Sequence, residues 1–185
     1  MKRLRIGDRD IGEDRPCFIV GEIGVCHDGD AAKAAKMIEI AALCGVDAVK
    51  LQRRNIDAIL THAAQDVPYV NERSFGATYG QHRRALELPD EAWPRLQELA
   101  HARGLVFFAT PYDPDSAAFL KALRVPAVKV ASCDVTNPPL LTAVATMGVP
   151  VLMSTGMSTE AEIDHAVRLI WRETIDLVLL HCISA

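Results

Sequence analysis

The chain has 185 residues, of which 50% are hydrophobic and 24% charged, a composition typical of a globular protein that buries a core. The formal net charge of −4 and the lack of a basic stripe exclude an electrostatic case for nucleic-acid binding. No apolar run reaches the length of a membrane span, and the basic start leads into Gly7-Asp8. We therefore expect neither a membrane segment nor a signal peptide. The five scattered cysteines have no metal-ligand spacing and fit a reducing compartment, which predicts a cytoplasmic protein.

The predicted elements begin with a β-hairpin over residues 4–11, which has a Gly7-Asp8 turn at its centre. After it, short apolar runs of buried-strand type alternate with segments of helical periodicity. The runs occupy residues 17–23, 47–52, 105–110, 127–132, 149–154 and 177–184. Asp30, Pro94 and Thr159 stand where the intervening helices are expected to start. This alternation predicts a parallel α/β architecture.

Two parallel architectures fit the alternation, the doubly wound sheet and the (β/α)8 TIM-type barrel. No GxGxxG follows the first run, which disfavours a dinucleotide-binding doubly wound sheet. Polar residues follow every run at its carboxyl end, as the catalytic face of a barrel requires. We therefore expect residues 1–185 to form an incomplete barrel with about six of eight strands, with the hairpin plugging its bottom.

The connection over residues 53–89 is about twice as long as its neighbours and has weak periodicity. It is expected to be a long loop or insertion over the active face. Asn71 in this segment is a candidate for binding a substrate.

Two of the apolar runs each contain a lysine, Lys50 and Lys129, followed by the small polar residues Gln52 and Ser132. A buried lysine is costly unless a negative group meets it, so the pair predicts a pocket for an anion such as a phosphate or carboxylate. In the alternative interpretation each lysine extends to solvent from an edge strand or pairs with an internal carboxylate, and Glu22 is a candidate partner for Lys50.

A series of short motifs resembles the N-acetylneuraminate (sialic acid) synthase family, which includes legionaminate, pseudaminate and spore-coat polysaccharide relatives. The motifs occur in the family's order from about residue 17 to residue 185. They are Gly21-Glu22-Ile23-Gly24 with His27 and Gly29, Ala48-Val49-Lys50-Leu51-Gln52, Leu86-Glu87-Leu88, Thr110-Pro111-Tyr112-Asp113, Val128-Lys129-Val130-Ala131-Ser132, Ser154-Thr155-Gly156-Met157 and His181-Cys182.

The resemblance implies that phosphoenolpyruvate condenses with an N-acetylated hexosamine, such as N-acetylmannosamine, and releases phosphate for carbohydrate biosynthesis. It implies catalytic roles for four charged residues and substrate contacts for five polar ones. The first set is Glu22, Lys50, Lys129 and Asp134, and the second is Gln52, Asn71, Thr110, Ser132 and Ser154. The lysines would meet the carboxylate and phosphate of phosphoenolpyruvate.

The chain departs from the family pattern at Ser132-Cys133-Asp134, where the family usually has Ser-Gly-Glu, so Asp134 is one methylene shorter than expected. Cys26 and Asp28 replace asparagines, and Tyr112 replaces a common phenylalanine. These changes bear on which sugar is taken more than on the reaction class.

The resemblance also implies parts that we do not expect in these residues. The family's divalent metal, Mn²⁺ or Mg²⁺, is held by two histidines that lie beyond this chain, so we expect no metal ligand here. The last two barrel strands and an antifreeze-like C-terminal domain are likewise expected to be missing, and the full-length form is expected to be a homodimer. The 185 residues would then be a fragment with little or no activity.

Two other classes remain open from the residues alone. In a class I aldolase, Lys129 or Lys50 would form a Schiff base with a keto substrate. In the other class, the chain would be a non-catalytic remnant that binds an anionic sugar or a full-length partner.

Overall fold

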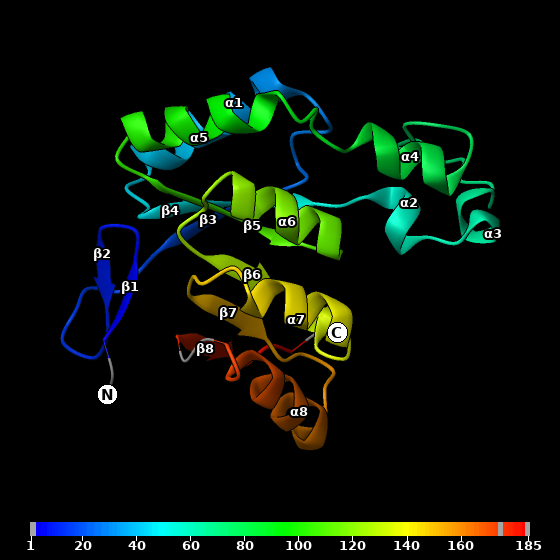
Figure 1. Cartoon of the computed structure of the whole chain (residues 1–185). Helices are drawn as coiled ribbons and strands as arrows, with labels where there is room; N and C mark the ends of the chain where they lie inside the picture. Colours follow the sequence, from blue (N-terminus) through cyan, green and yellow to red (C-terminus); the bar gives the residue numbers. More distant parts are fainter. Residues whose placement is uncertain (1–2, 174–175, 184–185) are drawn as a thin grey trace.

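The computed structural model of the chain describes residues 3–173 and 176–183. Its centre is a parallel sheet whose strands are hydrogen-bonded in chain order (Figure 1). The strands are β3 (Val20–Gly24), β4 (Ala48–Arg53), β5 (Val106–Pro111), β6 (Val128–Val130), β7 (Val151–Ser154) and β8 (Leu177–Leu180). A doubly wound sheet reverses its strand order at a switch point, whereas this order runs in one direction as in a (β/α)8 barrel. The prediction of six barrel-type strands is confirmed.

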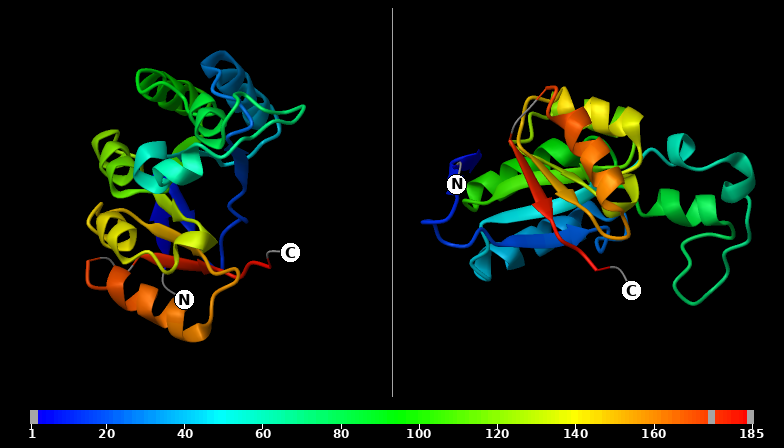
Figure 2. Two further views of the ribbon diagram at one scale, coloured as in Figure 1. Left: turned by 90° about the vertical axis from the view of Figure 1, so that its right-hand side faces the viewer. Right: turned by 90° about the horizontal axis from the view of Figure 1, so that it is seen from below.

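A helix accompanies each step from one strand to the next, and α5 to α8 line one side of the curved sheet (Figure 2). These helices are α1 (Ala31–Leu43), α5 (Ala92–Ala102), α6 (Pro114–Ala122), α7 (Pro138–Ala145) and α8 (Glu160–Ile170). Asp30 caps α1, and Thr159 forms a capping box with Glu162 on α8, as predicted. No helix among the described residues is long and apolar enough to cross a bilayer.

The core lies between the sheet and these helices. The central strands are buried on both faces, so Val49, Leu51, Phe107 and Phe108 are at most 1% exposed. Trp93 of α5 packs edge-on against the Phe107 ring, with 6.2 Å between the ring centroids. This packing fixes the strands whose carboxyl ends carry the polar residues.

The long connection predicted after β4 is an insertion with three short helices that project beyond the sheet (Figure 1). They are α2 (Ile56–Ile59), α3 (His62–Gln65) and α4 (Tyr79–Ala85). Asn55, Thr61 and Thr78 cap them with side-chain oxygens. Helices of one or two turns are too short to show a hydrophobic period, which is why the sequence pattern did not reveal them.

The predicted N-terminal hairpin is present as β1 (Leu4–Ile6) and β2 (Arg9–Ile11). Its turn residue Gly7 has φ +59°, and a Cβ there would lie 3.4 Å from the Val106 side chain at the start of β5. Arg9 donates a hydrogen bond to the Gly104 carbonyl at 3.1 Å. The hairpin therefore lies against the amino ends of the strands, which is the bottom of a barrel.

Ile6 is 0% exposed and belongs to the main core, so the hairpin contributes to stability. We expect Ile6→Ala to lower the free energy of unfolding by about 2–5 kcal/mol, because it removes buried methylene groups and leaves a cavity. Urea denaturation measures the change. The matched control is Ile40→Ala, at a position that is 49% exposed on α1, where we expect a change of about 0.5 kcal/mol or less. Equal losses of unfolding free energy in the two variants would contradict a contribution of the hairpin to stability.

Candidate active site

The carboxyl ends of the parallel strands bring most of the predicted site residues to one face. Two lysines meet hydroxyl groups there in the same way. Lys50 pairs in register with Phe108 and hydrogen-bonds Thr110, two residues further along β5. Lys129 pairs with Leu152 and hydrogen-bonds Ser154, two residues further along β7. The repeat predicted from sequence is therefore a repeat in structure.

Lys50 is the more buried of the two, with its side chain 7% exposed. Its Nζ lies 3.1 Å from Glu22 Oε2 and donates to Thr110 Oγ1 at 2.8 Å and to the Leu51 carbonyl at 3.3 Å. Burial lowers the pKa of Lys50, although the Glu22 carboxylate acts to raise it, and the charge of Lys129 lowers it further. The ion pair with Glu22 was one of the two alternatives that the sequence left open.

Lys129 is half-buried and donates to Ser154 Oγ and, at 3.3 Å, to the Val130 carbonyl. Burial lowers its pKa too, while Cys182, Glu22 and Cys133 act in the opposite direction. The charge of Lys129 is among the causes that lower the pKa of Lys50, and Glu22 acts on the pKa of both lysines. The two ammonium groups therefore belong to one polar site.

A bulge in β3 brings Gln52 into the same group. The register shifts between Glu22, opposite Lys50, and Gly24, opposite Leu51. Gly24 has φ +58°, and a Cβ there would lie 3.4 Å from Glu22 Oε1 and 3.6 Å from Gln52 Nε2. The Gly24 backbone therefore borders the Glu22 carboxylate and the Gln52 amide.

Ser132 and Asp134 follow β6 in a single 3-10 turn, η1 (Ser132–Asp134). Ser132 Oγ accepts the Gly156 N–H at 3.0 Å, which connects η1 with the segment after β7. Asp134 is buried and accepts from Asn137 Nδ2 at 3.0 Å. Burial raises the pKa of Asp134, so this carboxyl holds a proton more readily than an exposed aspartate.

Tyr112 is a site residue that the sequence marked only as a departure from the family pattern. Burial and the neighbouring Cys133, Asp134 and Glu22 raise its pKa to about 12, while Arg54 lowers it. Its phenol therefore stays protonated at neutral pH.

Asn71 is exposed on the insertion, where its Oδ1 accepts the Arg73 N–H at 2.8 Å. Within the described part of the chain, none of the other predicted site residues hydrogen-bonds to it. Its role toward a sugar stays a prediction.

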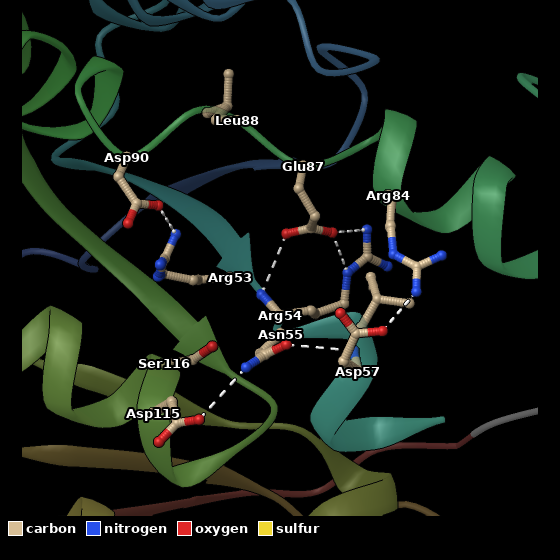
Figure 3. A pocket seen from close by; sticks show the side chains of 11 residues that line it. Arg53, Arg54, Asn55, Asp57, Arg84, Glu87, Leu88, Asp90, Asp115 and Ser116 are labelled. Carbon is tan, nitrogen blue, oxygen red and sulfur yellow. Dashed lines mark hydrogen bonds and ion pairs between the residues drawn. The ribbon is translucent and has the colours of Figure 1, made fainter. Parts of the chain in front are cut away.

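A polar cavity of about 270 Å³ lies beside the end of β4 (Figure 3). Arg54, with its side chain 4% exposed, donates from Nε to Glu87 Oε1 at 2.6 Å and from its backbone N–H to Glu87 Oε2 at 3.2 Å. Arg53 pairs with Asp90 at 2.9 Å, and Arg84 pairs with Asp57. Because each guanidinium has a carboxylate partner, the cavity offers little net charge for an anion.

A divalent cation needs several oxygen, nitrogen or sulfur ligands that converge on one point. Across residues 3–173 and 176–183, no group of three or more histidine, cysteine, aspartate and glutamate side chains is placed to hold a metal ion. The described residues therefore do not fit the metal that the family resemblance implies.

Burying the Lys50 ammonium should cost stability. We expect Lys50→Met to raise the free energy of unfolding at pH 7 by about 1 kcal/mol, as substitutions that relieve functional strain do. The pKa of Lys50 is lower in the folded state than in the unfolded state. At a pH between these two pKa values, the unfolded chain therefore holds a proton that the folded chain has lost. The wild type should therefore gain stability relative to Lys50→Met as pH rises through the folded pKa.

Thermal unfolding of both proteins from pH 7 into the alkaline range checks this difference. Lys121→Met, at an exposed position of α6, is the matched control and should not change with pH in the same way. A Lys50→Met protein that is less stable than the wild type at pH 7 would contradict the expected cost of burial.

The chain is similar to proteins that are named as synthases of N-acetylneuraminate 9-phosphate or of diacetyllegionaminic acid. A model of the NeuB family matches residues 37–185. Human N-acetylneuraminate-9-phosphate synthase is 35% identical over 175 residues, which are 95% of this chain and 49% of the human protein. The N,N'-diacetyllegionaminic acid synthase of Legionella pneumophila is 34% identical over 94% of this chain and 50% of its own.

A solved structure agrees with these relatives. The N-acetylneuraminic acid synthetase of Leptospira borgpetersenii, crystallised with citrate, has a TM-score of 0.84 and 32% identity, over 100% of this chain and 60% of that one. The chain spans about half the length of the curated relatives it matches. Because the family model matches most of its residues, the chain belongs to the NeuB family of sialic acid synthase homologues.

Proposed function

We propose that the chain is the phosphoenolpyruvate-binding part of a nonulosonic acid synthase, which condenses phosphoenolpyruvate with an N-acetylated hexosamine and releases phosphate. N-acetylmannosamine or a close relative is the proposed acceptor, and a surface polysaccharide is the proposed destination of the product. The observation that carries the proposal is the repeated lysine and hydroxyl pair, Lys50 with Thr110 and Lys129 with Ser154, on one face of the sheet.

The charges of this face suit phosphoenolpyruvate, which has a carboxylate and a phosphate. Two ammonium groups face one exposed carboxylate, Glu22, whose side chain is 55% exposed. The Thr110, Ser132 and Ser154 hydroxyls and the Gln52 amide add hydrogen-bond donors. Fixed donors of this kind also stabilise the charge that builds up on the phosphate as it departs.

The proposed reaction forms one carbon–carbon bond and breaks one carbon–oxygen bond. C3 of the enol attacks the aldehyde of the open-chain sugar, and the new alkoxide takes up a proton. Water adds at C2, where it forms a new C–O bond and loses a proton. Phosphate then leaves with the electron pair of its own C2–O bond, and the remaining C2 hydroxyl gives up its proton to become the keto group. Burial raises the pKa of Asp134, which suits this carboxyl to a proton-transfer role. Glu22 is suited to contact with the sugar or with the reacting carbons.

The relatives are named as synthases, and these names support the proposed reaction class. The metal, the oligomeric state and the activity of the isolated chain are further parts of the proposal. We propose that the Mn²⁺ or Mg²⁺ implied by the family is bound by residues outside this chain, that the complete protein is a cytoplasmic homodimer, and that residues 1–185 alone have little or no activity. Phosphate release by the purified chain from phosphoenolpyruvate and N-acetylmannosamine would overturn the last point.

Binding of phosphoenolpyruvate tests the proposal without requiring turnover. We expect the chain to bind it in calorimetry and Lys129→Met to weaken binding by about 10- to 100-fold, because a hydrogen bond to a charged group contributes about 1.5–3 kcal/mol. Lys121→Met, on the exposed face of α6, should bind as the wild type does. No binding at millimolar phosphoenolpyruvate, or equal affinity of the Lys129 and Lys121 variants, would argue against the site.

The lowered pKa values of both lysines also favour a second candidate, the Schiff-base class I aldolase, because a neutral amine is the nucleophile in that reaction. Borohydride reduction in the presence of pyruvate distinguishes the two functions. A pyruvate adduct on Lys50 or Lys129 supports the aldolase, whereas phosphoenolpyruvate binding without an adduct supports the synthase.

A further inference from the structure

The insertion after β4 contains a loop, residues 67–78, that joins α3 to α4 and is called the α3–α4 loop below (Figure 1). Its two ends are hydrogen-bonded to each other. The Tyr79 N–H donates to the Val67 carbonyl at 2.9 Å, and the Tyr69 N–H donates to the Ala77 carbonyl at 3.0 Å. Compact surface loops whose ends lie close together are frequently functional. This one contains Asn71, the predicted contact of the sugar.

Two side chains of α4 accept hydrogen bonds from the backbone of the loop. Gln81 Oε1 accepts the Ala77 N–H at 2.9 Å, and His82 Nδ1 accepts the Phe75 N–H at 3.2 Å. A Cβ on Gly76 would lie 2.5 Å from the Gln81 Cβ, so the loop backbone is in close contact with the helix. Of the two acceptors, the imidazole can no longer accept at Nδ1 once it is protonated, whereas the amide does not titrate.

The half-buried His82 ring also contacts two rings of the loop. Its centroid is 4.5 Å from that of Tyr69, and it stacks on Phe75 with 5.8 Å between the centroids. Tyr69 precedes Asn71 in the chain and Phe75 follows it. His82 therefore contacts the loop on both sides of Asn71.

Asn71 itself is held by a turn within the loop. Its Oδ1 accepts the Arg73 N–H at 2.8 Å, and its carbonyl accepts the Ser74 N–H at 3.0 Å. The Ser74 hydroxyl donates to the Tyr69 carbonyl at 2.5 Å. This turn ends one residue before Phe75, so the bond between Phe75 and the imidazole fixes the turn against α4.

The charged groups around His82 are exposed or engaged elsewhere. Three charged side chains on or next to the loop are exposed to solvent, namely those of Asp66, Glu72 and Arg73. On α4, Arg83 donates to the Tyr79 hydroxyl at 2.8 Å and lies 5.4 Å from the centre of its ring, and Arg84 pairs with Asp57. The titratable side chain in direct contact with the imidazole is that of Tyr69.

We propose that His82 is a positioning residue, whose neutral imidazole closes the α3–α4 loop on α4 and so holds Asn71 in place. Protonation turns Nδ1 from an acceptor into a donor, so the protonated ring releases the Phe75 N–H. The role rests on the proposed function in that Asn71 is expected to contact the sugar there. The closure of the loop does not depend on which anion binds.

Amide hydrogen exchange, followed by NMR at about pH 8 and about pH 5, measures this closure, because histidine side chains change charge in that range. Protection is expressed relative to an unstructured peptide at the same pH. We expect acidification to lower the protection of the Phe75 and Ser74 amides at least about fivefold, as the loss of one hydrogen bond does. The Phe107 amide in β5 should keep its protection, which excludes global unfolding.

Substitutions of His82 separate its acceptor from its ring contacts. His82→Phe keeps an aromatic ring beside Tyr69 and Phe75 but has no acceptor, so we expect low Phe75 protection at both pH values. His82→Gln provides an acceptor that does not titrate, so we expect no loss of protection in acid. The matched control is His62→Phe, at an exposed position of α3, which should respond to pH as the wild type does.

Three results would overturn the proposal. They are wild-type protection of Phe75 that stays constant while the His82 ring titrates, wild-type protection in His82→Phe, and an acid response of His82→Gln equal to that of the wild type. The wild-type measurement holds even where a variant does not fold. Imidazole nitrogen shifts of the wild type follow the ring and should show the Nε2–H tautomer at about pH 8, because Nδ1 accepts the Phe75 N–H.

Phosphoenolpyruvate calorimetry on the wild type keeps the two proposals apart. The hydrogen bonds of Lys50 and Lys129 involve no residue of the α3–α4 loop. A loop that opens in acid in a chain that does not bind phosphoenolpyruvate would overturn the proposed function and leave the positioning role supported. Binding of phosphoenolpyruvate without an acid-sensitive loop would overturn the positioning role.

Discussion

The burial of two ammonium groups at the carboxyl ends of parallel strands is the constraint on which the rest of this site depends. A lysine in a strand that is buried on both faces loses hydration that only local oxygens can replace. Lys50 and Lys129 solve this in the same way, each with a backbone carbonyl one residue on and a hydroxyl on the next strand. The parallel register fixes this geometry, since the hydroxyl lies two residues beyond the lysine's partner in both cases.

Buried polar contacts between loops hold the strand ends in place. Asp113, which is 2% exposed, caps α6 and also accepts the Asn55 N–H at 2.7 Å, so it ties the end of β5 to the end of β4. The Arg54 and Glu87 pair ties the same end of β4 to the segment after α4. Removing one partner of such a buried pair leaves an uncompensated charge, so these contacts set the loop positions more strictly than surface ion pairs do.

The sequence predicted the parts of the fold that are determined locally. Apolar runs placed the six strands, and the side chains of Asp30 and Thr159 marked real helix starts because capping depends on neighbours three residues away. It predicted that the lysines face one site, because carboxyl ends of parallel strands must meet. It did not reveal α2 to α4, the β3 bulge or the Arg54 and Glu87 pair, because these depend on short helices or on residues distant in the chain. Asn71 shows the same limit, since its place relative to the sheet depends on the whole insertion.

The two lysines are alike in backbone geometry but differ in charge balance, and this difference bears on how an anion would bind. Lys50 already has the Glu22 carboxylate at 3.1 Å, whereas the closest side-chain partner of Lys129 is the neutral Ser154 hydroxyl. An arriving anion would compete with the Glu22 carboxylate for Lys50, but at Lys129 it would compete only with neutral oxygens, the Ser154 hydroxyl and the Val130 carbonyl. Its charge would also raise the lowered pKa of Lys129, so binding would be accompanied by proton uptake wherever that lysine is partly neutral. In the proposed function, Lys129 would therefore be the stronger anchor for the first negative group of phosphoenolpyruvate, and Lys50 with Glu22 would meet the second group.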